Sequence, residues 1–139
     1  MRVDWIILCR YCEVNPGGAT IIGGGFDGMA VPAVPSPIQF MAAVRLVFQE
    51  GEAQVQHRIT ANVLDPAMEE ISAPFDTTFM ARRGPAALAG WEAAATVPMM
   101  LRFMAQTAGA YTINIAVDGR SQSITFVVNV GSQPPAPAG

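Results

Sequence analysis

The fold is decided by residues 111–130, which read YTINIAVDGRSQSITFVVNV. Large apolar side chains occupy alternate positions on both sides of the Asp-Gly pair at 118–119, which is the period of a β-strand with one buried face. An Asp-Gly pair between two such runs is typical of a tight hairpin turn. We therefore predict a hairpin whose inward residues are odd-numbered before the turn and even-numbered after it, with Val117 opposite Gln122.

The same alternation continues toward the N-terminus. Residues 38–48 and 55–63 predict a second hairpin, with its turn at 50–52 and with Val55, His57 and Ile59 on the inward face. Further predicted strands cover residues 2–13, 19–23, 71–79 and 97–105.

The segments between these strands complete the predicted fold. The turn sequence Asn-Pro-Gly-Gly at 15–18 predicts a third hairpin, and the Ala-rich residues 84–96 predict a loop with one helical turn. Short strands at this spacing predict an all-β fold, an antiparallel β-sandwich of the immunoglobulin or fibronectin kind with about eight strands.

The length of 139 residues predicts one domain, because domains typically hold about 100 to 200 residues. We assign residues 1–131 to the β-sandwich. Residues 132–139 contain three prolines and no apolar side chain larger than alanine, so they predict a disordered tail rich in Pro and Ala.

The composition excludes several kinds of chemistry. All eight basic residues are arginine, and His57 is the single histidine. A phosphate-binding loop of the Walker type and a pyridoxal Schiff base both need a lysine. The net charge of −3 argues against a nucleic-acid partner, whose phosphates attract positive charge. Only 14 % of residues are charged, against about 25 % in an average soluble protein, so the surface is short of charge.

The N-terminal segment bears on the location. Its uninterrupted apolar run extends only from Trp5 to Cys9, which is too short for a signal-peptide core or a membrane span. We therefore expect a cytoplasmic protein without a membrane partner, whose Cys9 and Cys12 are free thiols.

Two patterns could carry chemistry. Cys9 and Cys12 form a CxxC pair, but residues three apart on one strand point to opposite faces, and zinc needs further ligands. We therefore predict two unrelated cysteines and neither metal nor cofactor, with metal or redox use as the alternative. His57 is predicted to be a neutral, hydrogen-bonded histidine at the core. The enzymatic alternative would need His57 exposed beside Asp76 or Glu92, and without a nucleophile motif we predict no catalytic residue.

The run of glycines at residues 23–28 has two interpretations. Structurally, consecutive glycines permit positive φ angles or close packing where the chain leaves a sheet. Alternatively, a ligand loop made of Gly24, Gly25 and Phe26, together with Trp91, would hold a small molecule or a carbohydrate.

The outward faces of the strands carry the strongest functional signal. Arg and Met are enriched at protein interfaces, and several residues of both types occupy strand positions that are predicted to face solvent. Arg45 directly opposite Arg58 would be destabilising, so we expect a different register or an acidic group between them. The residues of the predicted interface are Met41, Arg45, Arg58, Met100, Arg102 and Met104.

Two stretches resemble an uncharacterised bacterial family, a domain of unknown function with a Gly-Gly-Gly-aromatic motif. They are Ile21-Ile22-Gly23-Gly24-Gly25-Phe26-Asp27-Gly28, and Gly109-Ala110-Tyr111 with Val117-Asp118-Gly119. The resemblance spans about residues 3 to 130. It implies a β-sandwich in a bacterial, cytoplasmic protein, and it brings no activity or site residues with it.

The leading hypothesis is a non-enzymatic interaction or structural module, which self-associates into an oligomer or docks a protein partner through an outward sheet face. The alternative is a module that binds a small molecule or a carbohydrate through loop aromatics. An enzyme is the third hypothesis.

Overall fold

The computed structural model describes residues 1–15, 18–72 and 74–131. In these residues the chain forms ten β-strands and one short 3-10 helix, so the all-β prediction is confirmed, with ten strands in place of about eight. The predicted tail at 132–139 and the turn residues 16–17 lie outside the described residues. The elements are β1 (Arg2–Cys9), β2 (Tyr11–Asn15), β3 (Gly18–Ile22), β4 (Gly28–Val31), β5 (Ser36–Phe48), η1 (Glu50–Glu52), β6 (Gln56–Leu64), β7 (Phe75–Met80), β8 (Ala93–Ala105), β9 (Gly109–Val117) and β10 (Arg120–Val130).

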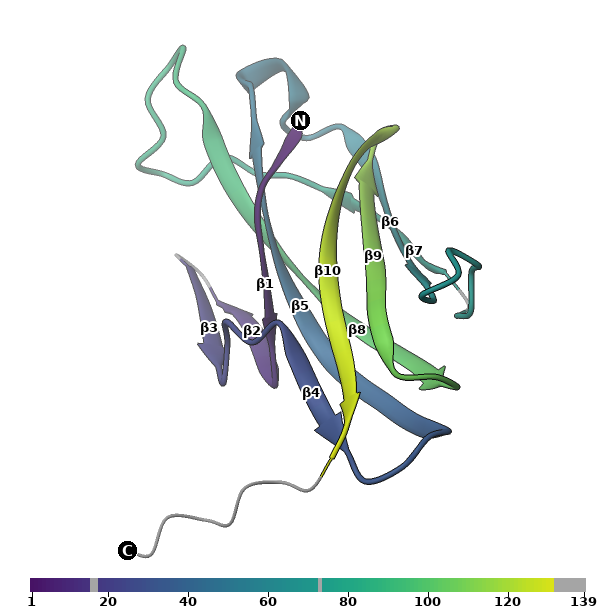
Figure 1. Cartoon of the computed structure of the whole chain (residues 1–139). Helices are drawn as coiled ribbons and strands as arrows, with labels where there is room; N and C mark the ends of the chain where they lie inside the picture. Colours follow the sequence, from purple (N-terminus) through teal and green to yellow (C-terminus); the bar gives the residue numbers. More distant parts are fainter. Residues whose placement is uncertain (16–17, 73, 132–139) are drawn as a thin grey trace, which may run out of the picture.

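Two sheets face each other across one hydrophobic core (Figure 1). The three-stranded sheet has the order β1-β5-β8, and the five-stranded sheet has the order β4-β10-β9-β6-β7. Strands β2 and β3 form a separate hairpin. All strand pairs are antiparallel except β4 and β10, which are parallel. The prediction of a purely antiparallel fold is therefore wrong at this pair. Alternation reports the buried face of a strand and not its direction relative to a neighbour, so the sequence could not reveal this parallel pair.

The C-terminal hairpin, β9–β10, is confirmed with a corrected register. Val117 pairs with Arg120, two positions before the predicted Gln122. Asp118 and Gly119 both have positive φ, 48° and 83°, which is the conformation of a two-residue hairpin turn. Both registers keep the same side chains inward, so alternation alone could not separate them.

The predicted hairpin of residues 38–48 and 55–63 is wrong, because β5 and β6 belong to different sheets. The chain crosses between the sheets through η1 and a turn at Gln54, whose φ is 59° and whose N–H donates to the carbonyl of Ala81. The inward faces of β5 and β6 therefore contribute to one core from opposite sides. Val55, predicted to face inward, precedes β6 and is half exposed. Alternation reports which face is buried, but not which sheet a strand joins.

Other boundaries also differ from the prediction. The strand predicted over residues 71–79 begins only at Phe75, as β7. The predicted strand 2–13 breaks at Arg10, so that β1 pairs with β5 while β2 pairs with β3 as the third predicted hairpin. The predicted helical turn is absent from the described residues between β7 and β8, and β8 already begins at Ala93. Pairing of Ala93 with Phe48 of β5 overrides the helix propensity of the alanines.

Tyr111, at the start of β9, is the largest fully buried side chain. Its ring packs against Phe103 with 5.3 Å between centroids, and its hydroxyl donates to the carbonyl of Thr107 at 2.6 Å. This bond ties the turn between β8 and β9 to the core. Tyr11, in contrast, is half exposed and donates to Glu13 at the surface.

We expect Tyr111→Phe to lower the free energy of unfolding by about 1–2 kcal/mol, because the hydrogen bond from the buried tyrosine side chain to the carbonyl of Thr107 is lost. Urea denaturation followed by circular dichroism measures the change. Tyr11→Phe makes the same chemical change at the surface and should alter stability by less than about 0.5 kcal/mol. Equal effects of the two substitutions would contradict the assigned role of the buried hydroxyl.

Candidate functional site

The outer face of the three-stranded sheet brings together five of the six residues predicted to form an interface. Across the pair β5–β8, Met41 lies opposite Met100, Gln39 opposite Arg102, and Pro37 opposite Met104. Arg45 lies further along β5, opposite Thr96. Sequence alternation therefore placed these side chains on the correct face.

Arg58 does not belong to this group. It lies on β6, in the five-stranded sheet, where its Nε and Nη2 donate to the carboxylate of Asp76 at 2.8 and 2.5 Å. The anticipated contact between Arg45 and Arg58 does not arise, because the two residues belong to different sheets.

The β2–β3 hairpin covers part of the outer face of the three-stranded sheet. Cys12 and Ile21 of the hairpin pack with Cys9 and Ala43 of the sheet in a second, smaller core. Met41 is half-buried there, with its sulfur 3.4 Å from the backbone nitrogen of Cys12. The shortage of charge on this face is thus explained in part by the chain's own hairpin.

Both cysteines are free thiols buried in this second core. The prediction that they point to opposite faces is wrong, because the strand breaks at Arg10. Burial raises the pKa of both thiols, and the neighbouring Cys12 raises the pKa of Cys9 further. Such thiols are held protonated and are poor nucleophiles and metal ligands. No group of three or more His, Cys, Asp and Glu in the described residues is placed to hold a metal ion.

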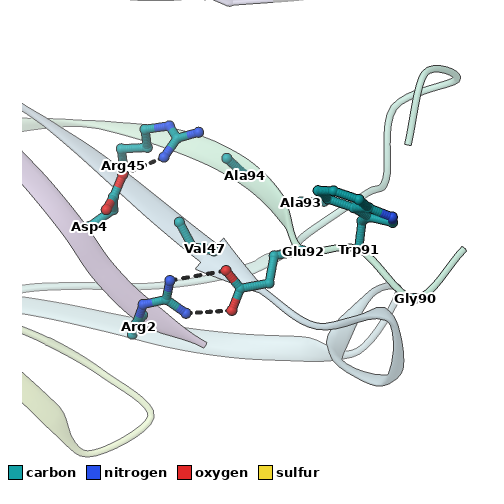
Figure 2. Close-up of a pocket in the computed structure, with 9 residues that line it drawn as sticks. All are labelled: Arg2, Asp4, Arg45, Val47, Gly90, Trp91, Glu92, Ala93 and Ala94. Carbon is teal, nitrogen blue, oxygen red and sulfur yellow. Dashed lines mark hydrogen bonds and ion pairs between the residues drawn. The ribbon is translucent and has the colours of Figure 1, made fainter. Parts of the chain in front are cut away.

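A cleft of about 520 Å³ lies at one end of the same sheet, where β1 starts, β5 ends and β8 starts (Figure 2). Arg2 donates two hydrogen bonds to the carboxylate of Glu92, at 2.6 and 3.0 Å, and Arg45 pairs with Asp4. The hydrogen bond and charge of Glu92 raise the pKa of Arg2, and those of Arg2 lower the pKa of Glu92. The cleft therefore contains two pairs of opposite charges.

Trp91 borders this cleft with 68 % of its surface exposed. It lies near the end of the loop between β7 and β8, and this loop is held by hydrogen bonds from two sides. The guanidinium of Arg83 donates to the carbonyl of Trp91 at 2.9 Å and to that of Leu88. The N–H of Gly90 donates to the carboxylate of Glu50 at 3.3 Å. The exposed indole is thus held on an anchored segment.

Phe26 lies far from Trp91, so the structure separates the two aromatics of the predicted ligand loop. Phe26 packs edge-on against Phe40 and Phe126, with centroids 5.8 and 6.1 Å away. Phe40 is eight positions from Phe48, the residue at the cleft end of β5, which is about 26 Å along a strand.

The glycines beside Phe26 adopt the structural role that the sequence allowed. Gly25 has a φ of 90°, and its N–H donates to the carbonyl of Leu8 at 2.9 Å. A Cβ on Gly24 would lie 2.9 Å from a methyl group of Ile21. Glycine is therefore required where the chain leaves the hairpin and packs closely on β1.

His57 is buried on the inward face of β6, as predicted. Its Nδ1 lies 2.5 Å from a carboxylate oxygen of Asp118, and its Nε2 lies 2.7 Å from the carbonyl oxygen of Glu52. Because both oxygens only accept, both ring nitrogens must donate, which favours the charged imidazolium over the neutral form expected from the sequence. Neither Asp76 nor Glu92 is the partner of this histidine.

Residues 4–129 match one protein family, described as a Family of unknown function (DUF6941). The chain belongs to this family. The DUF6941 match covers almost the same residues as the resemblance seen in the sequence, 3 to 130, and agrees that the family is uncharacterised. No match was found among curated proteins. In the described part of this DUF6941 chain, no helix is long and apolar enough to cross a bilayer.

Sequence reasoning missed the ion pairs of the cleft. Asp4 and Arg45 are forty-one residues apart, and Arg2 and Glu92 are ninety apart, so no local pattern joins them. One feature of this DUF6941 sequence did indicate that Asp4 has a charged partner. Asp4 interrupts an apolar strand, and a charge at such a position usually has a partner.

The environment of His57 predicts how stability depends on pH. Burial lowers the pKa of His57, but hydrogen bonds to Glu52 and Asp118 outweigh it, so the net effect is a raised pKa. Burial opposes ionisation of Asp118, yet hydrogen bonds from His57 and from the backbone of Arg58 lower its pKa. Stabilisation by His57 is therefore complete below the unfolded pKa of about 6.5 and is lost as pH rises through the folded pKa. Stabilisation by Asp118 is present above about pH 4 and is lost as pH falls.

We expect the free energy of unfolding to decrease between about pH 6 and pH 8 in the natural chain, because the folded state binds the proton of His57 more tightly. In His57→Gln the decrease over the same range should be much smaller. Urea denaturation at closely spaced pH values measures both curves. A natural chain whose stability stays constant or rises over this range would show that the imidazolium is not favoured on folding.

Proposed function

We propose that the two facing sheets form an immunoglobulin-like β-sandwich, with the β2–β3 hairpin added outside it. The order of the strands supports this. The three-stranded sheet contains β1, and it faces the five-stranded sheet, which contains β9 and β10. The hydroxyl of Tyr111 supports it as well. A tyrosine that follows the corner between the sheets and bonds back to the preceding turn is a hallmark of immunoglobulin-like sandwiches.

The protein, in this proposal, is a non-enzymatic docking module that pairs with a second copy of itself through β8 and the outer face beside it. The observation that carries the proposal is the alternation along β8. Met100 and Met104 are 38 % and 45 % exposed, with the exposed Arg102 between them. Flexible methionines and arginine are side chains that protein interfaces favour.

The edge of β8 supports the same conclusion. In the described residues this strand pairs only with β5, and it is 13 residues long. Other edges are protected: β4 and β7 have 4 and 6 residues, and the register of β1 shifts at Asp4. Long unpaired edges are templates for another strand, whereas short or irregular ones are not.

Pro98 limits this template to the second half of β8. A proline within a sheet is accommodated where its nitrogen faces away from the paired strand. Because the direction of the N–H alternates along a strand, Met100, Arg102 and Met104 direct theirs to the same open edge. A second copy that adds its own β8 would satisfy these groups, and a two-fold dimer is the commonest form of homo-oligomer.

We expect size-exclusion chromatography with light scattering to show a dimer whose fraction increases with protein concentration. The double variant Met100→Lys/Met104→Lys should raise the dimer dissociation constant at least about tenfold, because two ammonium groups would lose water in the interface. The matched control is Met68→Lys/Met80→Lys, which changes two exposed methionines elsewhere. A natural chain that stays monomeric at about 1 mM, or equal effects of both variants, would refute the proposal.

A further inference from the structure

We propose that the cleft beside Trp91 is a binding site for a neutral carbohydrate, with the indole as the platform for a pyranose ring. This inference is separate from the dimer through β8. The cleft lies at the start of β8, whereas the proposed dimer surface lies in the second half of that strand.

Trp91 offers an exposed aromatic face at the border of the cleft. With 68 % of its surface exposed, the side chain keeps a large apolar area in water, and a ligand bound in the cleft would cover part of it. The π face of an indole carries partial negative charge. The C–H groups on one face of a pyranose carry partial positive charge, so the two surfaces are complementary.

The platform is held in place before any ligand arrives. The carbonyl groups of Trp91 and Leu88 both accept from Arg83, and Gly90 donates to Glu50. A loop fastened at three points loses little conformational entropy on binding, which favours a measurable affinity for a small ligand.

The charges of the cleft select the class of ligand. Arg2 and Arg45 contribute two positive charges, and Asp4 and Glu92 contribute two negative charges, so the four side chains sum to zero. A charged ligand could bind the oppositely charged side chain of either ion pair only by displacing the present partner of that side chain. A neutral hydroxyl group both donates and accepts, and it can bond to the free donors of a guanidinium and the free lone pairs of a carboxylate together.

The remaining lining suits a sugar as well. Val47, Ala93 and Ala94 contribute small apolar surfaces between the two ion pairs and the indole (Figure 2). Alternating apolar and hydrogen-bonding surfaces match the C–H and O–H groups of a pyranose. The volume of about 520 Å³ is within the range of small-ligand sites, about 300 to 1,000 Å³.

The test is titration of the full chain with an array of neutral oligosaccharides, including cellobiose, maltose and lactose, followed by tryptophan fluorescence and by calorimetry. We expect saturable binding of at least one of them, with a dissociation constant near about 1 mM or lower. Glucuronate and glucosamine, which carry a charge, should bind at least about tenfold more weakly than the neutral sugar of the same size.

Variants locate the site. Trp91→Ala should weaken binding at least tenfold, and Arg45→Gln should weaken it by a smaller factor. The matched control is Tyr11→Ala, because Tyr11 is an aromatic residue that is 46 % exposed but does not line the cleft. It should leave affinity within about twofold, which corresponds to ~0.4 kcal/mol. Circular dichroism verifies that each variant is folded.

Three outcomes would overturn the proposal: binding of none of the neutral sugars, binding that Trp91→Ala leaves unchanged, or preference for a charged sugar. The dimer is measured separately. Trp91→Ala should leave the dimer dissociation constant unchanged, and Met100→Lys/Met104→Lys should leave sugar affinity unchanged. Failure of one proposal can therefore be distinguished from failure of the other.

Discussion

The burial of β5 on both of its faces is the constraint on which the rest of the structure depends. Ala42, Ala43 and Val44 are all fully buried, although consecutive residues of a strand point to opposite sides. One side faces the main core between the sheets, and the other side faces the β2–β3 hairpin. A central strand that is covered twice must carry small or apolar residues at every position in that stretch, and this explains why β5 lacks charge there.

The hairpin that covers β5 also divides the outer face of its sheet into separate regions. The hairpin lies over the middle, where Met41 and Cys9 pack beneath it. The second half of β8 stays open on one side, and the cleft with Trp91 stays open at the end where β1 starts. The two proposed interaction surfaces therefore lie outside the region under the hairpin, because its cover removes the central region from solvent.

The sequence predicted the buried faces better than the neighbours of each strand. Alternation correctly placed Met100, Arg102 and Met104 outside and His57 inside. It failed for Arg58, which it grouped with Arg45, because the crossing after β5 leaves the alternation of both strands unchanged. It also grouped Phe26 with Trp91 as loop aromatics, although Phe26 is half-buried against the core and Trp91 is exposed at the surface. In the sequence both aromatics follow a glycine, and that pattern does not distinguish a half-buried side chain from an exposed one.

By itself, the sequence determined that the chain is all-β, which side of most strands is buried, and where the hairpin at Asp118-Gly119 turns. These are local properties, since side-chain period and turn chemistry depend on residues within a few positions of each other. Only the tertiary structure decided which sheet each strand joins, which carboxylate pairs with Arg2, and that both nitrogens of His57 face acceptors. Those outcomes depend on contacts between residues five to ninety positions apart, and the same alternating pattern is compatible with several arrangements of them.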